Sequence, residues 1–192
     1  MSTQKFIVAV AGMQGSGKSL VGDVARQDGY DVVIMGDEVR AEVRKRNLAP
    51  TPENIGKIML ELRRLEGEVA IARRCIPKIE KTLKPKVLVD GVRSLSEVEE
   101  FKKRFGKVIL VAVHSSPETR FQRVYNRRRS DDPANWLIFR ERDLRELSVG
   151  LGNSIAMSEH IIVNEETLKT AKDKARQILK EIERKWTKSQ YT

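Results

Sequence analysis

An eight-residue run near the N-terminus has the residue types and spacing of a phosphate-binding loop. Residues 12–19 read Gly-Met-Gln-Gly-Ser-Gly-Lys-Ser, which fits the pattern G-x-x-x-x-G-K-[ST]. Glycines let a backbone wrap a phosphate so that successive N–H groups face its oxygens. We expect Lys18 to face solvent until it reaches the β and γ phosphates of ATP, and the Ser19 hydroxyl to bind Mg²⁺. The residues expected to bind ATP here are Gly12, Gln14, Gly15, Ser16, Gly17, Lys18 and Ser19.

A second carboxylate could complete the magnesium site. Asp90 closes the apolar run Lys-Val-Leu-Val-Asp at 86–90, and ATP-bound magnesium is commonly held by an acid at a strand end. The alternative is a turn residue, because Gly91 follows and Asp-Gly is a common turn dipeptide.

Arginines dominate one later segment. Residues 120–129 contain five arginines and no acid. Arg120, Arg123 and Arg127 recur at i, i+3 and i+7, so on a helix they share a face that could close over bound phosphates. Phosphoryl transfer needs such positive charge around its transition state. A solvated basic helix face is the alternative.

The elements that must position these residues alternate along the chain. Short apolar runs typical of buried strands lie at 6–11, 31–35, 86–89, 108–113 and 160–163. Helical patterns lie between and after them, at 19–27, 37–46, 53–83, 95–104, 118–150 and 166–186. This alternation predicts an α/β fold, the three-layer P-loop type with a five-stranded parallel sheet.

Length and composition exclude several classes of protein. The chain has 192 residues with 40% hydrophobic content, enough for one domain with a core. Its apolar runs are too short to cross a bilayer, and residues 1–12 lack a signal-peptide pattern, so we expect a cytoplasmic protein without membrane contact. The single cysteine, Cys75, permits no internal disulfide. A net charge of +10 suits an acidic partner.

Several further segments resemble adenylate kinases. Residues 89–93 (Val-Asp-Gly-Val-Arg) resemble the Asp-Gly-x-Pro-Arg segment of those enzymes, and 35–40 (Met-Gly-Asp-Glu-Val-Arg) resemble their Thr-Gly-Asp-x-x-Arg segment. Arg123 and Arg127 are spaced like lid arginines, and 129–132 (Arg-Ser-Asp-Asp) with Arg140 is similar to Arg-x-Asp-Asp and a later arginine.

A closer resemblance is to archaeal adenylate-kinase-related proteins, which are P-loop proteins of the nucleoside monophosphate kinase type. It is carried by 90–94 with Glu97, by Val-His-Ser-Ser-Pro at 113–117, and by 129–132. The segment Arg-Asp-x-Arg-Glu-Leu at 142–147 and the following Gly150-x-Gly152 complete it.

The resemblance implies roles for individual residues. Arg40 and Arg93 would bind the acceptor's phosphate, and Asp90 would hold Mg²⁺ through water. Near the adenine of ATP it places Arg123 and, by position after the last strand, Asn164. The residues implied to neutralise the transferring phosphoryl group are Arg127, Arg129 and Arg140. A helical acceptor-binding insert at about 53–83 and a short arginine lid at about 120–140 would complete the single domain.

Two residues bear on the acceptor. Asp37 could be a general base, which a hydroxyl acceptor would need and a phosphate acceptor would not. Alternatively, Asp37 caps the helix predicted at 37–46. Arg63, in the insert, could touch the acceptor.

The function favoured by these features is Mg·ATP-dependent phosphoryl transfer to a nucleoside monophosphate, with AMP as the leading acceptor. Phosphorylation of a hydroxyl, as in dephospho-coenzyme A kinase, is one alternative. A nucleotide-switched ATPase that binds RNA or a protein is another. Aromatic residues make up only 5% and form no RNP-like pattern, which disfavours nucleic acid as the partner. The choice between ATP and GTP and the oligomeric state stay open.

Overall fold

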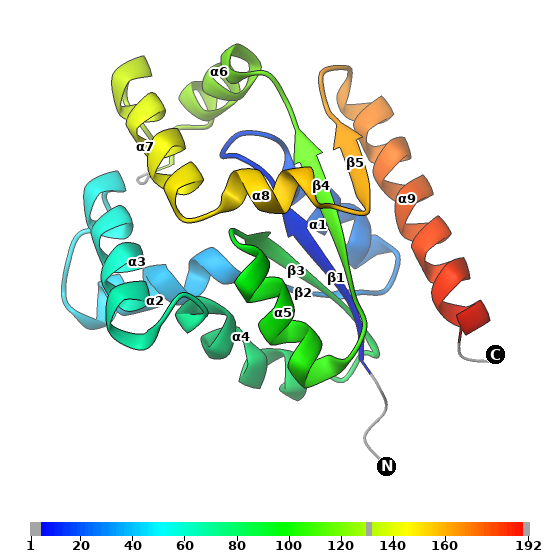
Figure 1. Ribbon diagram of the computed structural model, residues 1–192. Coiled ribbons are helices and arrows are strands. Elements are labelled where there is room, and N and C mark those ends of the chain that lie inside the picture. The colour runs from blue at the N-terminus through cyan, green and yellow to red at the C-terminus, as the bar shows by residue number, and fades with distance from the viewer. Residues whose placement is uncertain (1–4, 130–131, 190–192) are drawn as a thin grey trace.

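A parallel five-stranded sheet forms the centre of the molecule (Figure 1). The computed structural model describes residues 5–129 and 132–189. The strands are β1 (Phe6–Ala11), β2 (Asp31–Ile34), β3 (Lys86–Val92), β4 (Val108–His114) and β5 (His160–Val163). They are arranged in the order β2-β3-β1-β4-β5, and every neighbouring pair is parallel. The predicted strands and the α/β class are therefore confirmed.

Strand β1 is apolar throughout because it faces two hydrophobic cores. Phe6, Val8 and Val10 pack into one core, while the alternate residues of the strand pack into the other. Successive side chains of a strand point to opposite faces of the sheet, so a strand covered on both sides has no polar position.

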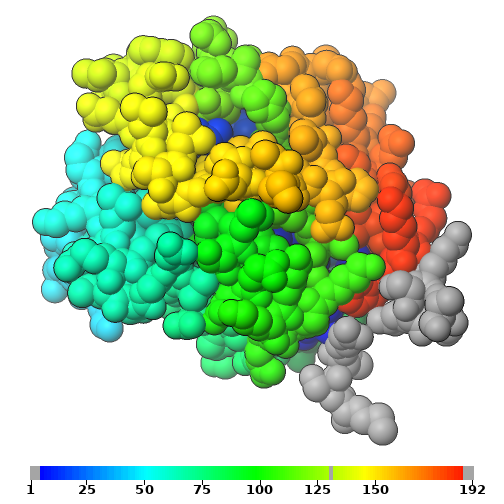
Figure 2. Space-filling view, in the orientation of Figure 1, coloured from blue at the N-terminus to red at the C-terminus, as the bar shows by residue number. Residues whose placement is uncertain are grey.

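Helices cover both faces of the sheet. Helices α1 (Lys18–Gln27) and α9 (Leu168–Ser189) pack together on one face. The other face is covered by α2 (Met35–Lys45), α3 (Pro52–Glu66), α4 (Ala70–Lys81), α5 (Leu95–Phe105) and α8 (Leu151–Ala156). Helices α6 (Pro117–Arg127) and α7 (Trp136–Ser148) follow β4. Figure 2 shows the side chains of α3, α5, α7 and α8 meeting over the second face.

Two predicted helices are wrong in extent. The pattern at 53–83 forms two helices, because Gly67 ends α3 with a φ of 91° that favours glycine. The pattern at 118–150 is interrupted after α6, because the next residue, Arg128, caps the helix in the left-handed region (φ 53°). Asn135 then begins α7 by accepting a hydrogen bond from the backbone N–H of Ile138 (3.0 Å). Ser130 and Asp131, part of the adenylate kinase resemblance, lie outside the described residues.

The loops that follow the strands bring the predicted site residues to one edge of the sheet. The glycine loop follows β1, α2 follows β2 directly, and Asp90 lies within the last residues of β3. Ligands of open parallel sheets bind at this carboxyl edge. Within residues 5–129 and 132–189, no helix has the length and apolar character needed to span a membrane.

Candidate active site

The glycine loop, residues 12–17, is held in shape by close packing. Gly15 has a φ of 77°, and a Cβ there would lie 2.5 Å from the carbonyl oxygen of Arg120 on α6. The carbonyl of Ser16 accepts hydrogen bonds from Asn164 Nδ2 (2.8 Å) and Ser115 Oγ (3.3 Å). The Ser16 hydroxyl is buried and has no hydrogen-bond partner among the described residues. An orphaned hydroxyl in a loop that tolerates no added Cβ fits a loop built to receive phosphate oxygens.

Lys18 is half-buried at the cavity and turned back onto the loop, and does not extend freely into solvent as expected. Its Nζ donates to the carbonyl oxygens of Gly12 (2.6 Å) and Met13 (3.0 Å). Burial lowers the pKa of Lys18, and the carboxylates of Asp90 and Glu146 counter that effect. The carbonyl groups of the loop itself satisfy the Lys18 ammonium until an anion replaces them.

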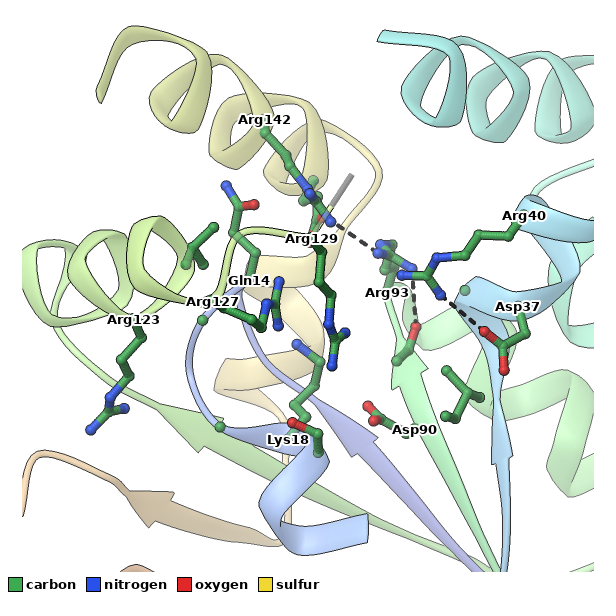
Figure 3. Close-up of a pocket in the computed structure, with 18 residues that line it drawn as sticks. Gln14, Lys18, Asp37, Arg40, Asp90, Arg93, Arg123, Arg127, Arg129 and Arg142 are labelled. Carbon is green, nitrogen blue, oxygen red and sulfur yellow. Dashed lines mark hydrogen bonds and ion pairs between the residues drawn. The ribbon is translucent and has the colours of Figure 1, made fainter. Parts of the chain in front are cut away.

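A cavity of about 350 Å³ opens beside the loop (Figure 3). Most of the predicted site residues line it: Gln14, Gly15, Gly17, Lys18, Ser19, Asp37, Arg40, Asp90, Arg93, Arg123, Arg127 and Arg129. They come from the glycine loop and the start of α1, from α2, from the end of β3, and from the segment from α6 onward. Residues distant in sequence are thus gathered on one cavity, as the P-loop interpretation requires.

The residues present fit a magnesium ion at this cavity. Asp90 and Ser19 both line it, and Asp90 is only 8% exposed. Burial raises the pKa of Asp90, while Lys18 and Arg93 counter that effect. Magnesium prefers oxygen ligands and usually keeps waters and substrate phosphates around one or two protein groups. A cluster of three or more potential metal ligands does not occur in the described part of the chain, so Ser19 and Asp90 would act with the nucleotide.

Two arginines lie on the opposite side of the cavity from the glycine loop (Figure 3). Arg40 donates to Asp37 Oδ1 (3.0 Å), and Arg93 donates to Gly91 O (3.4 Å). The prediction that Asp37 caps α2 is wrong, because α2 begins at Met35 and Ile34 holds the cap position. Asp37 lies in the first turn, where a carboxylate still favours the helix dipole.

The arginines of α6 divide into two groups, so the prediction that Arg120 belongs to a mobile phosphate clamp is wrong. Arg120 is buried and donates to both carboxylate oxygens of Asp143 (2.9 and 2.7 Å) and to Gln14 O (3.3 Å). It fixes α6 against α7 and the glycine loop. Arg123 donates to Ser115 Oγ (2.9 Å) at the cavity, and Arg127 donates to Asp132.

Five predicted site residues do not line this cavity. Gly12 and Ser16 are buried within the glycine loop itself, and the other three lie elsewhere. Arg140 is exposed on α7. Arg63 donates to Glu97 (2.6 Å) and lines a separate hollow of about 460 Å³ between α3, α5 and the start of α8. Asn164 is buried and supports the glycine loop from behind.

Two charged cavity residues were not predicted as site residues from the sequence. Arg142 and Glu146 both lie on α7 and line the cavity. Glu146 accepts hydrogen bonds from Arg93 Nη2 (3.2 Å) and Arg142 Nε (3.3 Å). Burial alone would raise the pKa of Glu146, but Arg93 and Arg142 outweigh it and hold the pKa at about 2. The i, i+4 spacing of the two residues was the available signal, and it does not reveal the third partner, Arg93.

Comparisons with known proteins assign the chain to a protein family. Residues 11–137 match the family described as an AAA domain. A UPF0200 protein from Hyperthermus butylicus is 47% identical over 175 residues, which are 91% of this chain and 94% of that protein. The chain belongs to the UPF0200 family. Another UPF0200 protein, from Methanocaldococcus jannaschii, is 44% identical over 179 residues, covering 92% of this chain and 90% of its own length.

Solved structures show that this UPF0200 protein has a P-loop kinase-like fold. A gluconokinase from Sinorhizobium meliloti 1021 superposes with a TM-score of 0.59 at 17% identity, covering 98% of this chain and 99% of its own. A shikimate kinase from Acinetobacter baumannii, in complex with shikimate, gives 0.57 at 21% identity with 94% of both chains covered. The chain therefore combines membership of the UPF0200 family with the fold of P-loop kinases, and the narrower relation to adenylate kinases stays a prediction.

Proposed function

We propose that this protein transfers the γ-phosphoryl group of Mg·ATP to a nucleoside monophosphate, with AMP as the leading acceptor. The observation that carries the proposal is one cavity, lined by the glycine loop and Lys18 on one side and by Arg40 and Arg93 on the other. Donor and acceptor phosphates would meet between them.

The donor side is formed by the loop and the residues after it. Loop N–H groups and Lys18 would bind the β and γ phosphates, and Lys18 would exchange its bonds to the loop carbonyls for bonds to phosphate oxygens. Ser19 and Asp90 would hold magnesium, which supplies neutralisation of the phosphate charge when bound. Arg123 would lie toward the nucleoside of ATP.

The balance of charge favours a phosphorylated acceptor. Among the described residues, seven cationic side chains and three carboxylates line the cavity, a net of four positive charges. Mg·ATP carries about two negative charges, and a phosphomonoester carries nearly two more at pH 7. Mg·ATP alone would leave about two positive charges uncompensated in a partly buried site. Donor and monophosphate together match the cavity.

The chemistry then needs positioning rather than a base. An ionised oxygen of the acceptor's phosphate attacks the γ phosphorus, the bond from that phosphorus to the β–γ bridging oxygen breaks, and ADP leaves with the electron pair. Arg127 and Arg129 would neutralise the equatorial oxygens, since both line the cavity. Asp37, held by Arg40 at 3.0 Å, would orient that arginine instead of removing a proton. The insert at about 53–83, which forms α3 and α4, would bind the acceptor. The arginine segment at about 120–140 would act as the lid, apart from Arg120, which is bound to Asp143.

A product screen tests the proposal. Protein with γ-labelled ATP is incubated with AMP, CMP, GMP, UMP, dephospho-coenzyme A or no acceptor, and Lys18→Ala serves as the inactive control. Label should appear in one nucleoside diphosphate. Label in a phosphorylated dephospho-coenzyme A would favour the hydroxyl acceptor, and release of inorganic phosphate at a rate independent of every acceptor would favour the switch ATPase.

A further inference from the structure

Glu146 connects the two cavity arginines that come from different elements. It lies on α7 and is 5% exposed. Its carboxylate accepts one hydrogen bond from Arg93, which directly follows β3, and one from Arg142 on α7 itself. Two guanidinium groups this close repel each other, and an ionised carboxylate between them offsets that repulsion. The carboxylate therefore fixes both groups at the cavity wall.

The guanidinium of Arg93 depends on Glu146 for its orientation. Its backbone N–H donates to Glu97 Oε2 (2.8 Å), which anchors the main chain, while Nη1 reaches only Gly91 O at 3.4 Å. In the described part of the chain, Arg93 Nε is buried and has no hydrogen-bond partner. A buried donor left unsatisfied in this way is available to an oxygen of a bound anion.

Helix α7 gives Glu146 a rigid support. Asp143, one turn before it, binds Arg120, which in turn donates to the carbonyl of Gln14 in the glycine loop (3.3 Å). The guanidinium of Arg145 lies so close to α3 that a Cβ at Gly56 would be 2.5 Å from its Cζ. One helix thus touches the donor loop, the insert and the acceptor arginine, and its place does not depend on Glu146 alone.

We propose that Glu146 is a positioning residue for the acceptor side, holding the Arg93 and Arg142 guanidiniums where they receive the acceptor's phosphate. This inference rests on the proposed function for the identity of that phosphate. Arginines already fixed in place lose less side-chain entropy when the anion binds, so the carboxylate increases acceptor affinity without touching the acceptor. Glu146 makes no hydrogen bond to the glycine loop, and the affinity for ATP should depend on it far less.

The test compares Glu146→Gln, Glu146→Asp and a control, Glu141→Gln, which removes an exposed carboxylate from the same helix. The first readout is the rate at which phenylglyoxal modifies Arg93 and Arg142 in the full-length protein, mapped by peptide mass spectrometry. The second is KM for the monophosphate and for ATP. Circular dichroism confirms that each variant is folded.

Loss of the carboxylate should act on one side of the site. In Glu146→Gln, we expect Arg93 modification to accelerate at least about fivefold and the acceptor KM to rise about tenfold or more, with the ATP KM within about twofold. Glu146→Asp keeps the charge but shortens the side chain, so its Arg93 modification rate and acceptor KM should lie between those of the wild type and Glu146→Gln. Glu141→Gln should match the wild type in both.

Two results would overturn the inference. One is unchanged reactivity of Arg93 in folded Glu146→Gln, or in Glu146→Asp if the first variant does not fold. The other is an equal rise in both KM values, which indicates general loosening. If the wild type phosphorylates no monophosphate, the proposed function fails, while the reactivity of the arginines still decides whether Glu146 positions them.

Discussion

Replacing Arg40 by alanine separates binding of the acceptor from stability of the fold. Arg40 lies on α2, lines the cavity and donates to Asp37 Oδ1 at 3.0 Å. The two side chains are 29% and 54% exposed, and solvent-exposed pairs of this kind contribute about 0 to 1 kcal/mol. Arg40→Ala should therefore change the free energy of unfolding by less than about 1 kcal/mol.

The effect on catalysis should be much larger. A charge-assisted hydrogen bond from a guanidinium to a phosphate contributes about 1.5 to 3 kcal/mol, which corresponds to a roughly 10- to 150-fold loss. We expect this loss in kcat/KM for the monophosphate, because Arg40 would bind the acceptor. The KM for ATP should change by less than about twofold, since the glycine loop and Lys18 are on the other side of the cavity.

Steady-state kinetics with each substrate varied in turn, together with urea unfolding, would measure both quantities. The matched control is Arg44→Ala, which removes an exposed arginine one turn further along α2 and should match the wild type in both assays. A folded Arg40→Ala whose kcat/KM for the acceptor stays within about twofold of the wild type would refute the assignment of this arginine. The same result with Arg93→Ala would remove the basis for a monophosphate acceptor.

Three further predictions follow from the same geometry. Lys18→Ala should keep its circular dichroism spectrum and lose ATP turnover, and turnover by a folded variant would argue against the P-loop interpretation. Asp37→Asn should keep its rate within about tenfold if the acceptor is a phosphate, whereas a loss of about 100-fold or more would indicate a hydroxyl acceptor that needs a base. Glu146 has a folded pKa of about 2, below its ordinary 4.5, so its ionised form stabilises the fold above pH 4.5 and this contribution falls as the pH drops toward 2. Urea melts across that range should lose roughly 3 kcal/mol from this group in the wild type, and this acid-dependent part should be missing in Glu146→Gln.

The parts of the site that could be predicted from the sequence are those defined by short-range spacing. The glycine loop follows a fixed pattern over residues 12–19, and Asp90 is found from the apolar run before it. Both depend on where a strand ends, and an unbroken apolar run gives that directly. Arg40 and Arg93 came from resemblance to short segments, and the structure brings both to the cavity.

The parts that could not be predicted depend on long-range contacts. Arg120 has the same spacing as its neighbours on α6, but its partner Asp143 lies on another helix and takes it away from the phosphates. Asp37 resembles a helix cap, yet α2 begins two residues earlier because the chain passes from β2 into the helix without a capping side chain. Glu146 was overlooked because its role exists only once α7 reaches the end of β3.

The place of β1 in the middle of the sheet has a consequence for protein synthesis. Ile7 pairs with both Val87 and Val108, so the first strand made has no neighbour until much of the chain has left the ribosome. The glycine loop gains its hydrogen bonds later still, because the side chains that donate to the Ser16 carbonyl belong to Ser115 and Asn164. Closing such distant contacts is slow, and a nascent chain that stops short of β5 lacks one of these two supports. If the loop binds nucleotide as proposed, that ligand would stabilise nearly finished chains and would protect truncated products of translation far less.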